Sequence, residues 1–169
     1  MITEVALAVG ASVLVFIVAQ FYRTYWNIPP VPTRENTIRD MVELADIRPR
    51  ERVADLGAGD GRLVAAFAKA GAEAHGYESN LFLVLYARRK IRNMGLQQSV
   101  HIHWMNFWKV NTAAFDAITI YGMPYVMAPL ERKLQAELRP GARVLSNYFE
   151  FPTWPIARTQ HDAHLYRQS

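Results

Sequence analysis

The feature that most constrains the fold is an apolar run that leads directly into a loop rich in glycine. Residues 52–56, RVADL, are mostly apolar, and glycine then occupies every second position from 57 to 61. Apolar residues at helical spacing follow at once, up to residue 70. A buried strand, a tight turn and a helix in this order are typical of the first unit of a parallel sheet in an α/β protein.

The rest of the chain alternates in the same manner between short apolar runs and helical patterns. Thr33 is expected to cap the first helix. Helices are predicted at residues 33–45, 61–70, 80–94 and 126–138, and strands at 52–56, 74–78, 100–104, 117–121 and 142–148, with a closing hairpin at 156–159 and 164–167. We therefore predict an α/β fold with a doubly wound, mostly parallel, seven-stranded sheet, whose ligand binds beyond the carboxyl ends of the strands.

A long apolar segment precedes this domain. Residues 5–22 are almost continuously apolar and would span about 27 Å as a helix, close to the thickness of a bilayer core. A secretory signal peptide would have a positive charge before its apolar segment, and none is present here. An aromatic and basic stretch follows the segment. We expect a single-pass transmembrane anchor in residues 1–26, with the N-terminus outside, then a proline-rich linker at 27–32 and a cytoplasmic domain at 33–169. A buried core helix is the alternative.

Composition excludes several kinds of chemistry. The chain has no cysteine, so disulfides, thiolate catalysis and cysteine-ligated zinc are excluded. His101 and His103 alternate along a predicted strand without a set of metal-ligating partners, so no metal site is expected. The net charge of +4 gives weak support for nucleic-acid binding, and no nucleic-acid partner is expected. The basic run at residues 88–92 is interpreted as a solvated helix face or a contact for anionic lipid.

Charged residues in and after the glycine loop indicate the ligand. The loop sequence at residues 55–61 contains two acids, Asp55 and Asp60, and Glu78 ends the next predicted strand, where a carboxylate can bind a ribose diol. A dinucleotide-binding loop would have its third glycine at position 62, which is Arg62 here. Two acids would repel a pyrophosphate but attract a sulfonium and an ammonium group. The loop therefore favours S-adenosylmethionine over NAD, and a structural turn without a ligand is the remaining alternative.

Several stretches of the chain resemble one group of enzymes. The loop sequence DLGAGDGR at residues 55–62 resembles the first motif of class I S-adenosylmethionine-dependent methyltransferases. Residues 31–167 are similar to the membrane-anchored protein-lysine methyltransferases of mitochondria that modify the ATP synthase c-subunit and the adenine nucleotide translocase. The stretches that carry this resemblance are VP at 31–32, GYESN at 76–80, FWKV at 107–110, GMP at 122–124, LERKL at 130–134 and FPTW at 151–154. The chain looks like a compact, bacterial-like member of that group.

The resemblance implies a Rossmann-like methyltransferase fold and a set of cofactor-binding residues. Glu78 would bind the ribose, and Asn106 and Phe107 would lie beside the adenine. The family usually has an acid at position 106, but asparagine can still accept a hydrogen bond from the adenine amino group. The residues expected in the loop, with the methionine portion of the cofactor, are Asp55, Gly57, Gly59, Asp60 and Gly61.

Aromatic residues after the fourth and fifth predicted strands are candidates for an acceptor pocket. Tyr121, Pro124, Tyr125 and Trp154 could hold a lysine ammonium, although the same side chains could simply fill the core. The resemblance implies a protein-lysine N-methyltransferase that acts on a protein in or near a membrane. A methyltransferase for a lipid or quinone-like small molecule and a catalytically silent cofactor-binding module are the alternatives.

Overall fold

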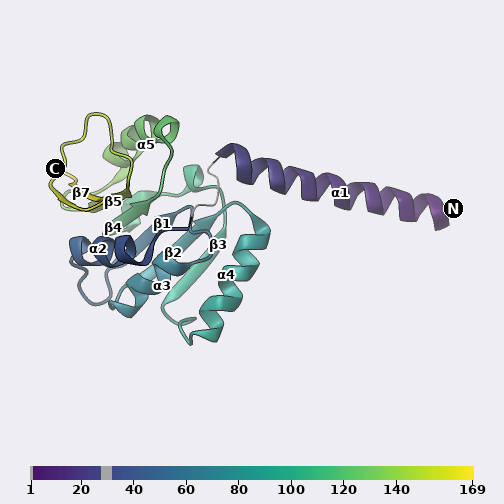
Figure 1. The fold of residues 1–169 in the computed structure, drawn as a ribbon, viewed down its shortest axis with the longest axis horizontal. Helices are drawn as coiled ribbons and strands as arrows, with labels where there is room; N and C mark the ends of the chain where they lie inside the picture. Colours follow the sequence, from purple (N-terminus) through teal and green to yellow (C-terminus); the bar gives the residue numbers. More distant parts are fainter. Residues whose placement is uncertain (1, 28–31) are drawn as a thin grey trace.

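The computed structural model describes residues 2–27 and 32–169 (Figure 1). The expected linker at 27–32 therefore lies almost entirely outside the described residues. The first element is α1 (Ile2–Asn27), a helix of 26 residues that projects away from a compact α/β domain (Figure 1).

The side chains of α1 that are described, from residue 3 to residue 19, are exposed to solvent, including Leu7 at 73% and Val15 at 68%. The alternative of a buried core helix is therefore wrong. Within residues 2–27 and 32–169, no helix is long and apolar enough to cross a membrane. This finding does not support the predicted transmembrane anchor.

A seven-stranded sheet forms the centre of the domain, as predicted, and its strand order is β3-β2-β1-β4-β5-β7-β6. β1 to β5 run parallel, and β7 runs antiparallel to both β5 and β6. The strands are β1 (Arg52–Leu56), β2 (Glu73–Glu78), β3 (Val100–Trp104), β4 (Ala117–Ile120), β5 (Arg143–Asn147), β6 (Arg158–Gln160) and β7 (Ala163–Arg167). The helices are α2 (Glu35–Ala45), α3 (Arg62–Lys69), α4 (Leu81–Asn93) and α5 (Pro124–Glu137), with short 3-10 helices η1 (Phe107–Lys109) and η2 (Thr112–Ala114).

Helices cover both faces of the sheet, because successive side chains of each strand point to opposite sides. Val53 belongs to the core beneath α2, α3 and α4, whereas the next residue, Ala54, belongs to the core beneath α5. Ala117 and Ile118 divide in the same way. Each of these four side chains is fully buried, which explains why the strands read as continuous apolar runs in the sequence.

Strand register brings the carboxyl ends of β1, β2 and β4 to one edge of the sheet. Leu56 lies opposite Tyr77 on one side and Ile120 on the other. The strand order reverses between β1 and β4, because the chain adds β2 and β3 on one side of β1 and then β4 and β5 on the other. An open α/β sheet normally binds its ligand at such a point. The glycine loop leaves β1 at this point.

Two helices, α2 and α5, begin two residues away from their predicted starts. The N-cap of α2 is Arg34, whose side chain makes no capping hydrogen bond, so the predicted cap at Thr33 is wrong. The carbonyl of Thr33 instead accepts a hydrogen bond from Arg62 Nη1 at 3.2 Å, which joins the start of α2 to the glycine loop. α5 begins at Pro124, earlier than expected, because proline is well suited to the first turn of a helix.

Gly76 in β2 is required for close contact between the sheet and the glycine loop. A Cβ at this position would lie 2.7 Å from Ala58 Cβ and 2.9 Å from Ile102 Cδ1. Gly76→Ala should therefore lower the free energy of unfolding by about 1–3 kcal/mol through overpacking, as measured by chemical denaturation. Gly10→Ala is the matched control, since its added Cβ meets nothing within 4 Å. Equal stability of the two variants would contradict the close contact.

Candidate cofactor-binding site

The glycine loop is held against the end of β2 by backbone hydrogen bonds. The N–H groups of Gly57 and Ala58 both donate to the carbonyl of Tyr77, at 2.9 and 3.1 Å. Gly57 has a φ of 98° and Gly59 has a φ of 53°, and residues other than glycine rarely adopt such positive values. A Cβ on either glycine would meet nothing within 4 Å, so this side of the loop is open to a ligand.

Gly61 has a different role from the other two glycines. Its φ is 78°, and it occupies the N-cap position of α3. A Cβ here would lie 3.3 Å from Ala87 Cβ, so the residue faces α4. The third glycine of the loop therefore allows α3 and α4 to pack closely, and its expected contact with the cofactor stays a prediction.

Glu78 lies next to the loop because β1 and β2 are neighbours. Its Oε2 accepts a hydrogen bond from Gly59 N at 3.1 Å, and its Oε1 accepts one from Asn80 N at 2.8 Å. Both carboxylate oxygens thus have a backbone donor, which fixes the side chain at the carboxyl edge. Each oxygen keeps a further lone pair for a ligand hydroxyl.

Asp55 is a buried acid at the end of β1. It is 4% exposed, and Oδ1 accepts a hydrogen bond from Thr119 Oγ1 at 2.7 Å. Burial raises the pKa of Asp55 to about 7, the Thr119 hydrogen bond opposes this rise, and the nearby charges of Glu78 and Asp60 add to it. Near neutral pH the group is therefore divided between its protonated and ionised forms, and a cation placed beside it would favour the ionised form.

Asp60 has the opposite environment. Arg62 and Lys90 donate hydrogen bonds to Asp60 Oδ2 at 2.9 and 2.8 Å. Burial alone would raise the pKa of Asp60, but these hydrogen bonds outweigh burial and lower the pKa to about 2. Asp60 was predicted to attract a cationic ligand together with Asp55, but two protein cations already pair with it. Asp55 and Glu78 are therefore the acids that can attract such a ligand.

Asn106 and Phe107 follow β3 at the same edge of the sheet. Met105 N donates to the carbonyl of Glu78 at 3.0 Å, so the chain after β3 continues beside Glu78. Asn106 Oδ1 accepts a hydrogen bond from Trp108 N at 3.0 Å and caps η1. The ring of Phe107 lies 4.9 Å from the ring of Trp108, between centroids. Both candidates are partly exposed, and their contact with an adenine stays a prediction.

The four candidates for the acceptor pocket separate into two groups. Tyr121 directly follows β4 at the carboxyl edge, and Pro124 and Tyr125 form the exposed first turn of α5. Trp154 is 6% exposed and lies in the core beneath α5, where its Nε1 donates to the Arg167 carbonyl at 3.2 Å. Trp154 is therefore part of the core, and the role of Tyr121 and the start of α5 in holding an acceptor stays a prediction.

Two contacts that define the site were not predicted from the sequence. Thr119 is the hydrogen-bond donor to Asp55, and Lys90 is one of the partners of Asp60. Thr119 is separated from Asp55 by 64 positions, so only the pairing of β1 with β4 brings them together. Lys90 belongs to the basic run that was interpreted as a solvated face, and its spacing from neighbouring charges gave no sign of an inward contact.

Comparison with known proteins identifies the family. The family model described as the ANTKMT methyltransferase domain matches residues 55–158, which includes the glycine loop and all four acceptor candidates. A lysine N-methyltransferase of the ATP synthase c-subunit from Rattus norvegicus is 40% identical over 127 residues, 75% of this chain and 58% of that protein. A protein-lysine N-methyltransferase of Saccharolobus islandicus is 35% identical over 130 residues, 76% of this chain and 81% of that protein.

A solved structure agrees with this assignment. A crystal structure described as an RNA methyltransferase from Salinibacter ruber in complex with S-adenosyl-L-homocysteine has a TM-score of 0.76 and 30% identity, covering 82% of this chain and 92% of that one. The chain spans little more than half the length of the mammalian relatives that it matches. The matched region, the sheet order and the glycine loop agree, and the chain belongs to the ANTKMT methyltransferase domain family.

Proposed function

We propose that this protein transfers a methyl group from S-adenosylmethionine to a lysine side chain of another protein. The observation that carries the proposal is the pair of carboxylates, Asp55 and Glu78, on either side of an open glycine loop. One carboxylate is buried and becomes ionised most readily beside a cation, and the other is held at the distance of a hydrogen bond from the loop backbone. Both features suit a ligand that combines a positively charged end with a ribose.

Different residues of the site bind different parts of the cofactor. Asp55 attracts the positively charged methionine portion, and the open faces of Gly57 and Gly59 allow close approach of the backbone. Glu78 accepts hydrogen bonds from the ribose hydroxyls. Asn106 and Phe107 contact the adenine, with the amide as hydrogen-bond acceptor and the ring as an apolar surface.

Methyl transfer depends more on the relative position of the two reactants and on a neutral amine than on a strong base. The cofactor supplies a methyl group that is activated by its bond to a positively charged sulfur. The lysine Nζ lone pair forms the new N–C bond as the C–S bond breaks, and the resulting ammonium loses a proton to solvent. Tyr121 and Pro124 hold the acceptor at the carboxyl edge, where burial of the amine lowers its pKa and favours the neutral form.

The Asp55 carboxyl makes cofactor binding depend on pH. Because its pKa is about 7 in the free protein, binding of a cation requires loss of a proton below that pH. Affinity for the cofactor should therefore be up to about tenfold weaker at pH 6 than at pH 8, as measured by calorimetric titration. Asp55→Asn should bind weakly at both pH values, and any pH dependence that it retains reports the titration of the ligand itself.

The same substitution should make the cofactor-free protein more stable. An acid whose pKa is raised from 3.8 to about 7 on folding destabilises the folded state progressively as pH rises through this window. Asp55→Asn removes that charge and should raise the free energy of unfolding at pH 8 by about 2–4 kcal/mol. Chemical denaturation of both proteins at pH 5 and pH 8 measures the effect, and a variant that is less stable at pH 8 would contradict the buried carboxylate.

The lysine acceptor is supported by the names of the relatives in rat and in Saccharolobus islandicus. Two other acceptors have observations in their favour. A demethylmenaquinone methyltransferase of Clavibacter sepedonicus is 29% identical over 118 residues, and the similar Salinibacter ruber structure is described as an RNA methyltransferase. The small-molecule alternative and an RNA acceptor are therefore included in the test.

Isotope transfer separates these acceptors. The full chain is incubated with cell membranes, total RNA and extracted lipid in separate reactions that contain methyl-labelled cofactor. We expect label in protein that yields methyl-lysine after acid hydrolysis, and loss of that label with Asp55→Asn. Label in RNA or lipid alone would overturn the lysine assignment, and no transfer to any of the three would favour a catalytically silent module.

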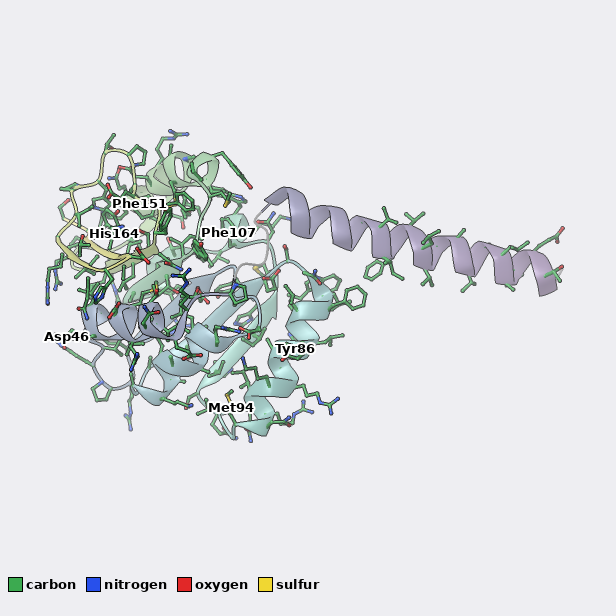
Figure 2. The ribbon with its side chains drawn as sticks, in the orientation of Figure 1. Asp46, Tyr86, Met94, Phe107, Phe151 and His164 are labelled. Atoms are coloured by element: carbon green, nitrogen blue, oxygen red, sulfur yellow. The ribbon has the colours of Figure 1, made fainter. Side chains whose placement is uncertain are left out.

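We further propose that α1 associates with a membrane. Most of its described side chains are apolar, and all of them are exposed. Phe82, Tyr86 and Trp104 on the neighbouring part of the domain are each about half exposed. Figure 2 shows Tyr86 on α4, on the side of the domain from which α1 projects. Aromatic side chains of this kind favour the interface between a bilayer and water.

Vesicle flotation tests this association. The full chain should float with vesicles that contain anionic phospholipid. Leu7→Asp combined with Val15→Asp should abolish flotation, because two charges then interrupt the exposed apolar surface of α1. Gln97→Asp combined with Gln98→Asp is the matched control, since it adds the same charge at exposed positions of the domain. Equal flotation of both double variants would contradict a role for α1.

A further inference from the structure

A second cluster of polar side chains lies away from the cofactor site, on β2 and β3. Glu73 and His75 belong to β2, and His101 and His103 belong to β3. His75 pairs with His101 in the parallel register, and His103 pairs with Tyr77, so these side chains share one face of the sheet. Glu73 is the first residue of β2, at the opposite end of the strand from Glu78, which separates the cluster from the cofactor site.

We propose that Glu73, His75 and His101 bind a divalent transition-metal ion, with zinc as the expected metal. The ligand atoms of these three side chains all lie within 4.8 Å of one another, and His75 Nε2 is 3.0 Å from Glu73 Oε1. In a tetrahedral zinc site with bonds of about 2.0–2.2 Å, neighbouring ligand atoms are about 3.3–3.5 Å apart. Imidazole and carboxylate ligands suit zinc, and water would complete the coordination.

The ligands that must rotate to reach a common metal ion are the exposed ones. His75 is buried at 7% exposure and supplies the fixed ligand. The side chain of Glu73 is 44% exposed, and His101 is partly exposed, so both can rotate toward a common ion. A metal can therefore enter from solvent, and only the two outer ligands need to move.

His103 holds the central ligand in the orientation that the metal requires. Its Nε2 lies 3.1 Å from His75 Nδ1, and its ring stacks on Tyr77 with centroids 4.7 Å apart. When His75 Nε2 binds the metal, His75 Nδ1–H donates to His103 Nε2. A hydrogen bond to the second nitrogen of a ligating imidazole is a regular feature of metal sites and fixes the tautomer.

The charges around the cluster predict that it binds a metal with moderate affinity. The neutral imidazole is the form of histidine that binds a metal. Arg52 opposes the metal, because its Nε lies 3.8 Å from Glu73 Oε1 and competes for that carboxylate. Its guanidinium lies 5.1 Å from the centroid of the Phe115 ring. Three protein ligands and one competing cation therefore predict weaker binding than at a closed zinc site with four protein ligands.

Calorimetric titration of the chelator-treated full chain, without an affinity tag, with zinc chloride tests the proposal. We expect one equivalent of zinc to bind and the Tm to rise on saturation, since the metal binds the folded state and joins two strands. His101→Ala and Glu73→Gln should each weaken zinc binding at least tenfold. Glu73→Gln preserves the shape of a partly exposed side chain, so it remains informative where His101→Ala reduces folding.

His161→Ala is the matched control, because it removes a histidine that lies outside the cluster and has a side chain that is 75% exposed. This variant should bind zinc with the affinity of the unmodified chain. Absence of zinc binding at about 1 mM metal, or equal loss of affinity in His161→Ala and His101→Ala, would overturn the proposal. Binding that is unchanged in both His101→Ala and Glu73→Gln would overturn it as well.

Discussion

The end of β2 holds the glycine loop in place, and the candidate site depends on that attachment. The Tyr77 carbonyl accepts two backbone N–H groups of the loop, and the Glu78 carboxylate accepts a third from Gly59. Gly76 permits the close approach, because a Cβ there would overlap Ala58. The carboxylate proposed to bind the ribose is therefore also a support for the loop, so loop conformation and ribose recognition cannot change independently.

Two acids five positions apart in the loop have opposite electrostatic environments. Asp60 pairs with Arg62 and Lys90 and is stable as a carboxylate, whereas Asp55 is buried with Thr119 as its hydrogen-bond donor. An unpaired buried carboxylate destabilises a fold, and proteins tolerate this most readily where a ligand later supplies the opposite charge. The contrast between the two acids, rather than their number, is what favours a cationic ligand beside Asp55.

The sequence allowed prediction of elements whose signal is local. β1 and β3 have the predicted bounds, because β1 is a largely apolar run that ends at the glycine loop and β3 alternates apolar residues with histidine. The prediction failed where contacts between distant residues decide the outcome. The carbonyl of Thr33 binds Arg62 instead of the side chain capping α2, and Thr119 reaches Asp55 only through the pairing of β1 and β4. Strand order is not encoded in the spacing of residues, so neither contact had a local signal.

The same reasoning explains why a metal site was not expected from His101 and His103 alone. Their potential partners lie about 26–28 positions earlier, and the register of β2 against β3 brings them together. Among the described residues, β3 is an edge strand that pairs with β2 alone, so its position rests on one row of hydrogen bonds and on packing against α4 and α3. A metal that joins β2 to β3 would fix the two strands that end at Glu78 and lead into Asn106, and would thereby hold the ribose and adenine ligands at a constant separation.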